Sequence, residues 1–174
     1  VTFDVIGDVV LIEARKQYGG FTVPSVDLIL DPYVEKKKKK YVDKYLRLAI
    51  DKDTAEAEAY ADVVRDFEQG FQGWEYKFNT VASSRGDYPF ITVTAGTGTG
   101  RFAKQATISM LNVRRRGQGK KECKKPVLFP KIVFLYDENL HGPGKPLEDV
   151  FEAGVQCSAK TMYPDWLSLT GKGY

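Results

Sequence analysis

Histidine and cysteine are scarce in this chain, and their scarcity excludes several kinds of active site. The 174 residues include one histidine and two cysteines. Cys123 and Cys157 are too far apart for a CxxC motif, so they predict neither a zinc site nor a disulfide framework. His141 lies in the glycine- and proline-rich turn LHGPGKP, a location that argues against a Ser-His-Asp triad. Paired carboxylates and activated nucleophiles are also missing, so the sequence predicts no catalytic residue and no metal ligand.

Long apolar runs are missing as well. The segment Val1–Ile12 is apolar, but Asp4 and Asp8 interrupt it. It lacks both the basic flank of a signal peptide and the length of a membrane span. The net charge of +3 is too small to indicate a nucleic-acid protein by itself. The sequence therefore predicts a cytoplasmic protein without membrane contact, with enough apolar residues (43%) for a core.

Helical spacing of apolar residues dominates residues 1–82 and predicts three helices. The expected boundaries are a break at Gly19-Gly20, a second helix from Pro32 to Ile50, and an N-cap of the third helix at Asp53 or Thr54. Five consecutive lysines, Lys36–Lys40, lie in the second helix. They wrap most of the way around it, which favours a solvated face. An anion-binding role for part of the run is the alternative.

The third helix has the strongest periodicity. Its apolar residues recur at steps of four and three, as in a heptad seam: Tyr60, Val64, Phe67, Phe71, Trp74, Phe78 and Val81. Gly70 and Gly73 interrupt the seam, and its side chains are aromatic, so an ordinary two-stranded coiled coil is disfavoured. Packing on the chain's own sheet is the first expectation. Packing of part of the seam against another subunit is the second.

After residue 87 the periodicity changes to alternating strands and helices. The predicted strands are Tyr88–Ala95, Lys131–Tyr136 and Trp166–Leu169, and the predicted helices are Arg101–Arg115 and Pro146–Lys160. This alternation implies parallel pairing with right-handed crossovers and strands buried on both faces. The fold class is thus α/β, with a helical half (1–82) and a βαβαβ portion (83–174) in a single partial domain.

The glycine and threonine loop Gly96–Gly100 lies between a predicted strand and a predicted helix. Such a junction presents backbone N–H groups to a phosphate. The loop nearly satisfies the dinucleotide fingerprint GxGxxG, but Arg101 stands where the third glycine belongs, and the later acidic residue is missing. Three interpretations stay open: a phosphate on the loop amides assisted by Thr97 or Thr99, a plain turn with a threonine cap, and a Rossmann site, which is the least favoured.

The segment Arg114–Pro126, RRRGQGKKECKKP, concentrates positive charge. Flexible basic loops attract polyanions. This one lacks the interleaved aromatic residues with which proteins stack single-stranded bases. A solvated loop is favoured over a nucleic-acid contact.

Five segments carry a resemblance to a known family. They are QYGGFTVP (Gln17–Pro24), DPYVEKKKKKY (Asp31–Tyr41), FNTVASSRGDYPF (Phe78–Phe90), KKPVLFPKIVFLYDENLHGPGKPLEDVF (Lys124–Phe151) and CSAKTMYPDW (Cys157–Trp166). Motifs such as QYGG, SRG-x-x-PF and SAKTMYP are specific in combination. Over nearly its whole length, the chain resembles the anaerobic (class III, glycyl-radical) ribonucleoside-triphosphate reductases.

The resemblance implies a ten-stranded α/β barrel of which this chain would be an interior portion. For the parent enzyme it implies radical reduction of ribonucleoside triphosphates, a glycyl radical installed by an iron-sulfur/S-adenosylmethionine activase, and a structural zinc. The family's thiyl-forming cysteine lies in an MGCR motif expected beyond Tyr174, with the glycyl-radical and zinc motifs further on. The second active-site cysteine is expected before Val1. The isolated chain is therefore expected to be inactive and to need the remaining reductase segments.

The resemblance also assigns substrate contacts. Thr97 and Thr99 match a threonine-bearing loop, and Ser84 and Arg85 match a Ser-Arg pair near the nucleotide substrate. The two pairs flank opposite ends of the strand Tyr88–Ala95, which would span about 26 Å. Because ligands collect at the carboxyl ends of parallel strands, strand geometry favours the threonines for direct phosphate contact.

Lys36 and Lys40 match lysines in the helical region that forms the family's homodimer and binds its deoxynucleotide effectors. The alternative function is a non-catalytic nucleotide-binding or dimerisation module left from a split or interrupted reductase gene. A nucleic-acid binder acting through the basic segment is a third and less favoured possibility.

Overall fold

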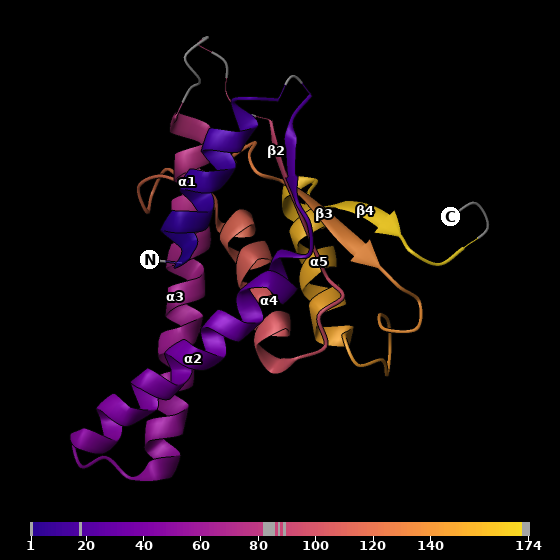
Figure 1. The fold of residues 1–174 in the computed structure, drawn as a ribbon. Coiled ribbons are helices and arrows are strands. Elements are labelled where there is room, and N and C mark those ends of the chain that lie inside the picture. Colours follow the sequence, from indigo (N-terminus) through magenta and orange to yellow (C-terminus); the bar gives the residue numbers. More distant parts are fainter. Residues whose placement is uncertain (1, 18, 82–85, 87, 89, 172–174) are drawn as a thin grey trace.

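The computed structural model of the chain describes residues 2–17, 19–81, 86, 88 and 90–171 (Figure 1). Its elements, in order, are α1 (Thr2–Ala14), β1 (Phe21–Val23), α2 (Val26–Arg47), α3 (Lys52–Thr80), β2 (Ile91–Ala95), α4 (Arg101–Arg116), β3 (Lys131–Tyr136), α5 (Glu148–Thr161) and β4 (Asp165–Ser168). The predicted α/β class and the mainly helical first half are confirmed.

The sheet has four parallel strands in the order β1-β2-β3-β4. Phe21 pairs with Ile91, Thr92 with Lys131, and Val133 with Asp165, so each crossover leads to the neighbouring strand. Parallel pairing was predicted; the strand β1 was not. A ten-stranded barrel stays a prediction, since the described residues contribute four strands to one sheet.

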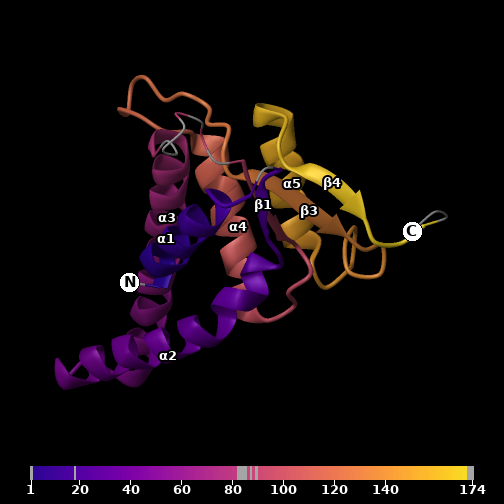
Figure 2. The same cartoon turned by 45° about the horizontal axis from the view of Figure 1, so that its top comes forward.

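One face of the sheet is covered by helices α4 and α5 (Figures 1 and 2). Ile91, Val93 and Ala95 are buried in β2, whereas Thr92 and Thr94 between them are half-buried. The strand β3 alternates in the same way, and all of β4 is exposed. The expectation that both faces would be buried is therefore wrong for this chain. The second face stays partly open to solvent because no helix of the described chain covers it.

The second helix begins six residues earlier than predicted. Ser25 adopts a left-handed conformation (φ 44°), and α2 starts at Val26, so that Pro32 lies inside the helix. The third helix begins at an Asp51 cap, whose side chain accepts a hydrogen bond from the Thr54 N–H at 3.0 Å. This is the Ser/Thr/Asp capping geometry that was expected two or three residues later.

The aromatic seam of α3 packs within the chain, against helices rather than the sheet. Helix α3 contacts α1, α2 and α4, which corrects the expected sheet contact. The Phe3 ring of α1 lies 5.0 Å from the Phe71 ring and 5.1 Å from the Trp74 ring, measured between centroids. A Cβ at Gly70 would lie 2.3 Å from the Phe3 ring. That glycine, which looked like an interruption of the seam, is what lets Phe3 enter it.

The helices α2 and α3 form a hairpin that projects away from the sheet, toward the lower left of Figures 1 and 2. Two tyrosines of α2 fasten it: the Tyr41 hydroxyl donates to Asp66 and the Tyr45 hydroxyl to Asp62, both at 2.7 Å. Burial, with help from the Asp66 hydrogen bond, raises the pKa of Tyr41 well above its usual range. The hydrogen bond to Asp62 likewise raises the pKa of Tyr45. Among the described helices, none is long and apolar enough to cross a membrane.

Candidate nucleotide-binding sites

The loop Gly96–Gly100 follows β2 at its carboxyl end and leads into α4. The N–H groups of Gly96 and Gly98 both donate to Oδ2 of Asp27, at 3.1 and 3.0 Å. The Thr107 hydroxyl approaches the same oxygen at 3.4 Å. A carboxylate of the protein itself thus holds the two amides that were considered for a phosphate.

Close packing explains the glycines of this loop. A Cβ at Gly98 would lie 2.4 Å from the Cβ of Ala103 and 3.0 Å from Oδ2 of Asp27. Gly96 has φ +127°, a backbone conformation that side-chain-bearing residues rarely adopt. The glycine pattern therefore serves contact between strand, loop and helix. Packing alone accounts for the glycine pattern, without a bound dinucleotide.

The single histidine holds the loop from its other side. Nδ1 of His141 accepts a hydrogen bond from the Asp137 N–H at 3.0 Å, which leaves the ring proton on Nε2. Nε2 then donates to the Gly96 carbonyl at 2.8 Å. The ring is 2% exposed and both of its nitrogens are used, in keeping with the argument against a catalytic triad.

The predicted substrate contacts fall in two places. Thr97 is half-buried and Thr99 is exposed, both at the carboxyl edge of the sheet. Ser84 and Arg85 lie outside the described residues. The structure therefore locates the threonines where parallel strands gather ligands, and their role in substrate binding stays a prediction.

The lysine run is divided between two environments. A groove of about 630 Å³ lies between the start of α1, the middle of α2 and α3, and Lys36, Lys37 and Lys40 line it. Lys38 instead forms an ion pair with Glu56 of α3. The two predicted effector lysines, one helical turn apart, are thus brought to the same groove.

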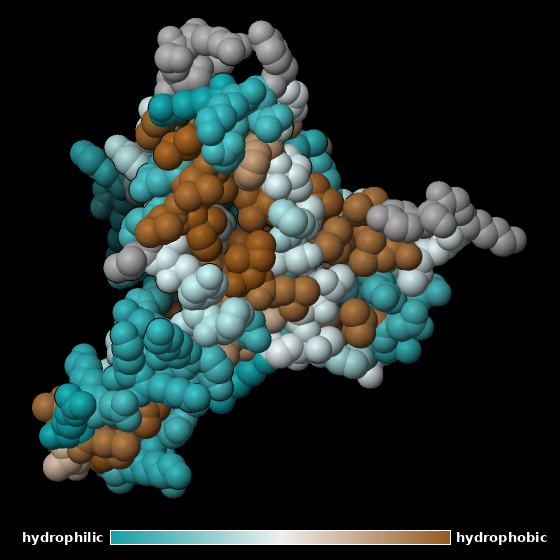
Figure 3. Space-filling view, in the orientation of Figure 1, coloured by the Kyte–Doolittle hydropathy of each residue, from teal (hydrophilic) through white to brown (hydrophobic). Residues whose placement is uncertain are grey.

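The groove combines cationic, polar and apolar groups. Its remaining lining residues are Thr2, Phe3, Asp4, Leu30, Tyr33, Val34, Val63, Asp66, Phe67, Gln69 and Gly70. The ammonium group of Lys37 lies 5.0 Å from the centroid of the Tyr41 ring. In Figure 3 the hairpin is mostly hydrophilic, next to an apolar area over α1. Such a mixture suits an amphipathic anion with a flat apolar part.

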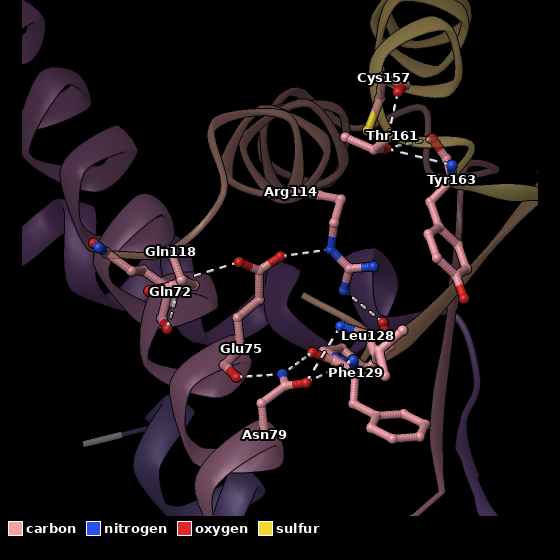
Figure 4. A network of polar contacts seen from close by, with 11 residues as sticks. Gln72, Glu75, Asn79, Arg114, Gln118, Leu128, Phe129, Cys157, Thr161 and Tyr163 are labelled. Atoms are coloured by element: carbon pink, nitrogen blue, oxygen red, sulfur yellow. Dashed lines mark hydrogen bonds and ion pairs between the residues drawn. The ribbon is translucent and has the colours of Figure 1, made fainter. Parts of the chain in front are cut away.

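Sequence reasoning missed a buried ion pair. Nε of Arg114 lies 2.8 Å from Oε1 of Glu75, and the Nη2 group of Arg114 donates to the Pro130 carbonyl at 2.6 Å (Figure 4). Gln118 donates to the second carboxylate oxygen of Glu75 at 3.0 Å. Asn79 donates to the Phe129 carbonyl and accepts from the Phe129 N–H. This network joins α3 and α4 to the segment that enters β3.

These contacts correct part of the expected solvated loop. Arg114–Arg116 form the last turn of α4, and Arg114 is buried. Arg115 bonds to Gln156, and Arg116 pairs with Glu68 at 3.1 Å. Residues 119–125 are exposed, and an antiparallel bridge between Gln118 and Lys125 closes off this basic loop. The arginines are thus engaged within the protein.

The two cysteines differ in environment. Cys123 is exposed and Cys157 is buried. Burial raises the pKa of the Cys157 thiol, which keeps it protonated and poorly nucleophilic. Among the described residues, no three His, Cys, Asp or Glu side chains gather closely enough to hold a metal ion. The structural zinc that the family implies therefore finds no ligand set in the described part of the chain.

Comparison with known proteins extends the resemblance to the whole chain. The family model described as anaerobic ribonucleoside-triphosphate reductase matches residues 1–174. The reductase of that name from Enterobacteria phage T4 is 35% identical over 159 residues, which cover 89% of this chain and 25% of the relative. Those of Haemophilus influenzae and Escherichia coli are 35% and 33% identical over 171 residues, covering 97% of this chain and 23% of each relative. The chain spans about a quarter of the length of these curated relatives.

Proposed function

The chain belongs to the anaerobic ribonucleoside-triphosphate reductase family, and from this premise we propose that it is a nucleotide-binding portion of such a reductase. In this proposal the lysine groove binds a deoxynucleotide effector. The carboxyl edge of the sheet, with Thr97 and Thr99, faces the ribonucleoside triphosphate substrate. The radical chemistry is carried by segments outside this chain.

One observation carries the proposal: Lys36 and Lys40, which family motifs assign to effector binding, line a single groove together with Lys37. Three ammonium groups on one wall offer positive charge and hydrogen-bond donors to the phosphates of a nucleotide. A volume of about 630 Å³ lies within the usual range for small-molecule sites. Phe3 and Tyr33 in the lining offer flat apolar surface for a base.

Two carboxylates, Asp4 and Asp66, line the groove together with the three lysines, so one positive charge remains in excess. Asp66 accepts the Tyr41 hydroxyl, so part of its hydrogen-bonding capacity is used within the hairpin. Lys38 does not line the groove and forms an ion pair with Glu56 instead. The groove thus keeps a cationic side toward α2 and a polar side toward α3. That asymmetry would orient a ligand with its phosphates near the lysines.

The chain's own residues bind and orient in this proposal, and transfer no hydrogen atom. The glycyl radical of the family would supply the radical chemistry, and neither it nor the zinc is assigned to residues of this chain. Cys157 is unsuited to radical transfer to a substrate because it is fully buried. The open face of the sheet, with half-buried Thr92 and Thr94, is consistent with a chain that forms part of a larger enclosed site.

Homodimerisation through the hairpin is a further part of the proposal. At its tip, Leu46 and Leu48 are 45% and 64% exposed, and burial in a symmetric contact would remove this apolar surface from water. Sedimentation equilibrium measures the molecular mass of the protein in solution and so distinguishes a monomer from a dimer. A monomer at all concentrations, with and without effector, would remove dimerisation from the proposal.

The effector site is tested by calorimetric titration of dATP and dTTP into the chain. In a Lys36→Ala, Lys40→Ala double variant we expect the affinity to fall by about tenfold or more, because charge-assisted hydrogen bonds to phosphate are lost. A Lys39→Ala, Lys44→Ala variant removes equal charge from the same helix outside the groove and serves as control. Equal affinity in the two double variants would return the lysines to the role of a solvated face.

A further inference from the structure

The basic loop of residues 119–125 carries positive charge that the protein itself does not neutralise. Four lysines and one glutamate give the loop a net charge of +3, which equals the formal net charge of the whole chain. The lysines are exposed, and within the described part of the chain none of them forms an ion pair. By contrast, the basic side chains before and after the loop are paired with carboxylates: Arg114, Arg116 and Lys131. The four unpaired lysines are Lys120, Lys121, Lys124 and Lys125.

Hydrogen bonds within the loop give it a defined shape. Gln118 and Lys125 exchange two backbone hydrogen bonds, at 2.9 and 2.8 Å, and the Cys123 N–H donates to the Lys120 carbonyl at 2.9 Å. Gly119 has φ +117°, and a Cβ there would lie 2.8 Å from the Cys123 carbonyl oxygen. Because the lysines are presented on a loop that is already folded, less conformational freedom is lost when a partner binds.

Large apolar side chains are exposed where the loop joins the rest of the protein. The Gln118 side chain donates to the Gln72 carbonyl of α3 at 3.3 Å. Tyr76 follows one turn later on that face of the helix and is 66% exposed. After the loop, the Leu128 N–H donates to Oδ1 of Asn79 at 3.3 Å, and the Leu128 side chain is also 66% exposed. In Figure 4 both Gln118 and Leu128 meet α3, so Tyr76 and Leu128 lie at the base of the loop.

The loop lies at the amino edge of the sheet. It leads through Leu128 into the start of β3, whereas Thr97 and Thr99 follow the carboxyl end of β2. Parallel strands begin at one edge of a sheet and end at the other, so the loop and these threonines lie at opposite edges. In Figures 1 and 2 the loop, drawn in orange, projects beside the C-terminal end of α3. Binding to the loop therefore stands apart from the proposed effector and substrate sites.

The side chains of this surface select among anionic partners. Proteins that bind single-stranded nucleic acid stack its bases on aromatic residues placed among the basic ones, and residues 117–126 contain no aromatic side chain. A protein segment can present carboxylates to the lysines and an apolar side chain to Tyr76 and Leu128 at the same time. Complementary charge then favours the encounter and the choice of partner, while burial of apolar area adds affinity.

We propose that the basic loop, together with Tyr76 and Leu128, is a docking surface for another protein, which binds through an acidic segment that contains a large apolar side chain. The lysines attract and orient the carboxylates of this segment. Tyr76 and Leu128 cover its apolar side chain at the base of the loop.

The charged part of the surface is tested with a fluorescein-labelled peptide in which glutamates flank a Leu-Phe pair, added to the chain while fluorescence anisotropy is followed. We expect saturable binding at low salt. In a Lys121→Gln, Lys124→Gln variant the affinity should fall by about tenfold or more. A Lys39→Gln, Lys145→Gln variant removes equal charge from exposed positions outside the loop and should bind within about twofold of the unmodified chain. Absence of binding at low salt, or equal affinities in the two variants, would overturn the proposal.

The shape of the loop is tested by Gly119→Ala, which keeps every charge. Its Cβ is forced against the Cys123 carbonyl oxygen, so the loop must deform. We expect the peptide to bind about threefold or more weakly, because the lysines are no longer held in place. Unchanged affinity in this variant would reduce the binding to a diffuse attraction of charges and overturn the loop as a docking element.

The apolar part is tested by a Tyr76→Ser, Leu128→Ser variant. Its affinity for the Leu-Phe peptide should fall by about fivefold or more, because less apolar area is buried. Its affinity for an all-glutamate peptide of equal charge should match that of the unmodified chain. Equal affinity for the Leu-Phe peptide before and after the substitutions would overturn the docking of an apolar side chain at the base of the loop.

An oligothymidylate of the same charge decides between a protein and a nucleic acid as the partner. At equal salt concentration we expect the chain to bind it more weakly than the Leu-Phe peptide. Tighter binding of the oligothymidylate, lost in the Lys121→Gln, Lys124→Gln variant, would identify the loop as a nucleic-acid contact and overturn the proposed protein partner.

Discussion

The side chains of Glu75 and Arg114 form an ion pair at 2.8 Å while only 4% and 1% exposed, respectively. Their pairing brings α3 and α4 together, and Arg114 extends the contact to the Pro130 carbonyl at the entrance of β3. A pair of this kind is sensitive to the loss of one partner, because the remaining charge is buried without compensation.

Removal of one charge from this pair should destabilise the fold strongly. For Glu75→Gln we expect the free energy of unfolding to fall by about 3–5 kcal/mol, measured by urea denaturation. Arg116→Met, which breaks the exposed pair with Glu68, is the control and should cost at most about 1 kcal/mol. Similar losses in the two variants would contradict the buried character of the Glu75–Arg114 pair.

The two glycines of the α3 seam should respond in opposite directions to alanine. Gly70→Ala places a Cβ 2.3 Å from the Phe3 ring and should lower stability, whereas a Cβ at Gly73 meets nothing within 4 Å. Gly73→Ala should raise stability by about 0.5–1 kcal/mol, as alanine does in helix interiors. Thermal unfolding of both variants measures the difference. Stabilisation by Gly70→Ala would mean that Phe3 does not pack into the seam.

The cysteines should differ in reactivity in the native state. Cys123 is exposed, while burial raises the pKa of the Cys157 thiol. Because the thiolate is the reactive form, we expect one rapid equivalent of a chromogenic disulfide reagent to be consumed at pH 8. The Cys157 thiol should consume a second equivalent only when the protein unfolds. A Cys123→Ser variant identifies the fast thiol, and a fast reaction in that variant would show Cys157 to be accessible.

The chain alone should not reduce any ribonucleoside triphosphate. Anaerobic incubation with labelled CTP, an activase and a reductant, followed by separation of deoxynucleotides, measures turnover. A complete reductase treated in parallel is the positive control. Formation of deoxynucleotide by the chain would place radical chemistry within these residues and refute the proposed division of labour.

Elements with a strong local pattern were predicted from the sequence almost to the residue. Strand β3 has the predicted bounds, and α4 differs by one residue, because each is an uninterrupted run between clear breaks. The strand β1 was missed because three residues between Gly20 and Pro24 give no periodicity. The start of α2 was misplaced because proline favours a first turn, whereas here the helix accommodates Pro32 further in.

The site shows where local reasoning ends. Lys36 and Lys40 were singled out through the family resemblance, and the structure places both of them in one groove. Nothing near Asp27 in the sequence indicates that its partners are Gly96 and Gly98, because a single aspartate at a helix start resembles an ordinary solvated first turn. The Glu75–Arg114 pair was equally hidden, since its members lie 39 residues apart. Both charges are recognisable as interior groups only once the tertiary contacts are known.

Within the described residues, β1 and β4 each have a neighbouring strand on one side only. The outer backbone N–H and C=O groups of such strands are templates on which further strands add. The outer edges of β1 and β4 can thus pair with strands from other reductase segments or with strands from a second copy of the chain. Trp166 and Leu167 on β4 are 40% and 39% exposed, so this strand also presents apolar side chains to solvent. Self-association of the chain through these strand edges should therefore increase with its concentration, despite the net positive charge of its copies.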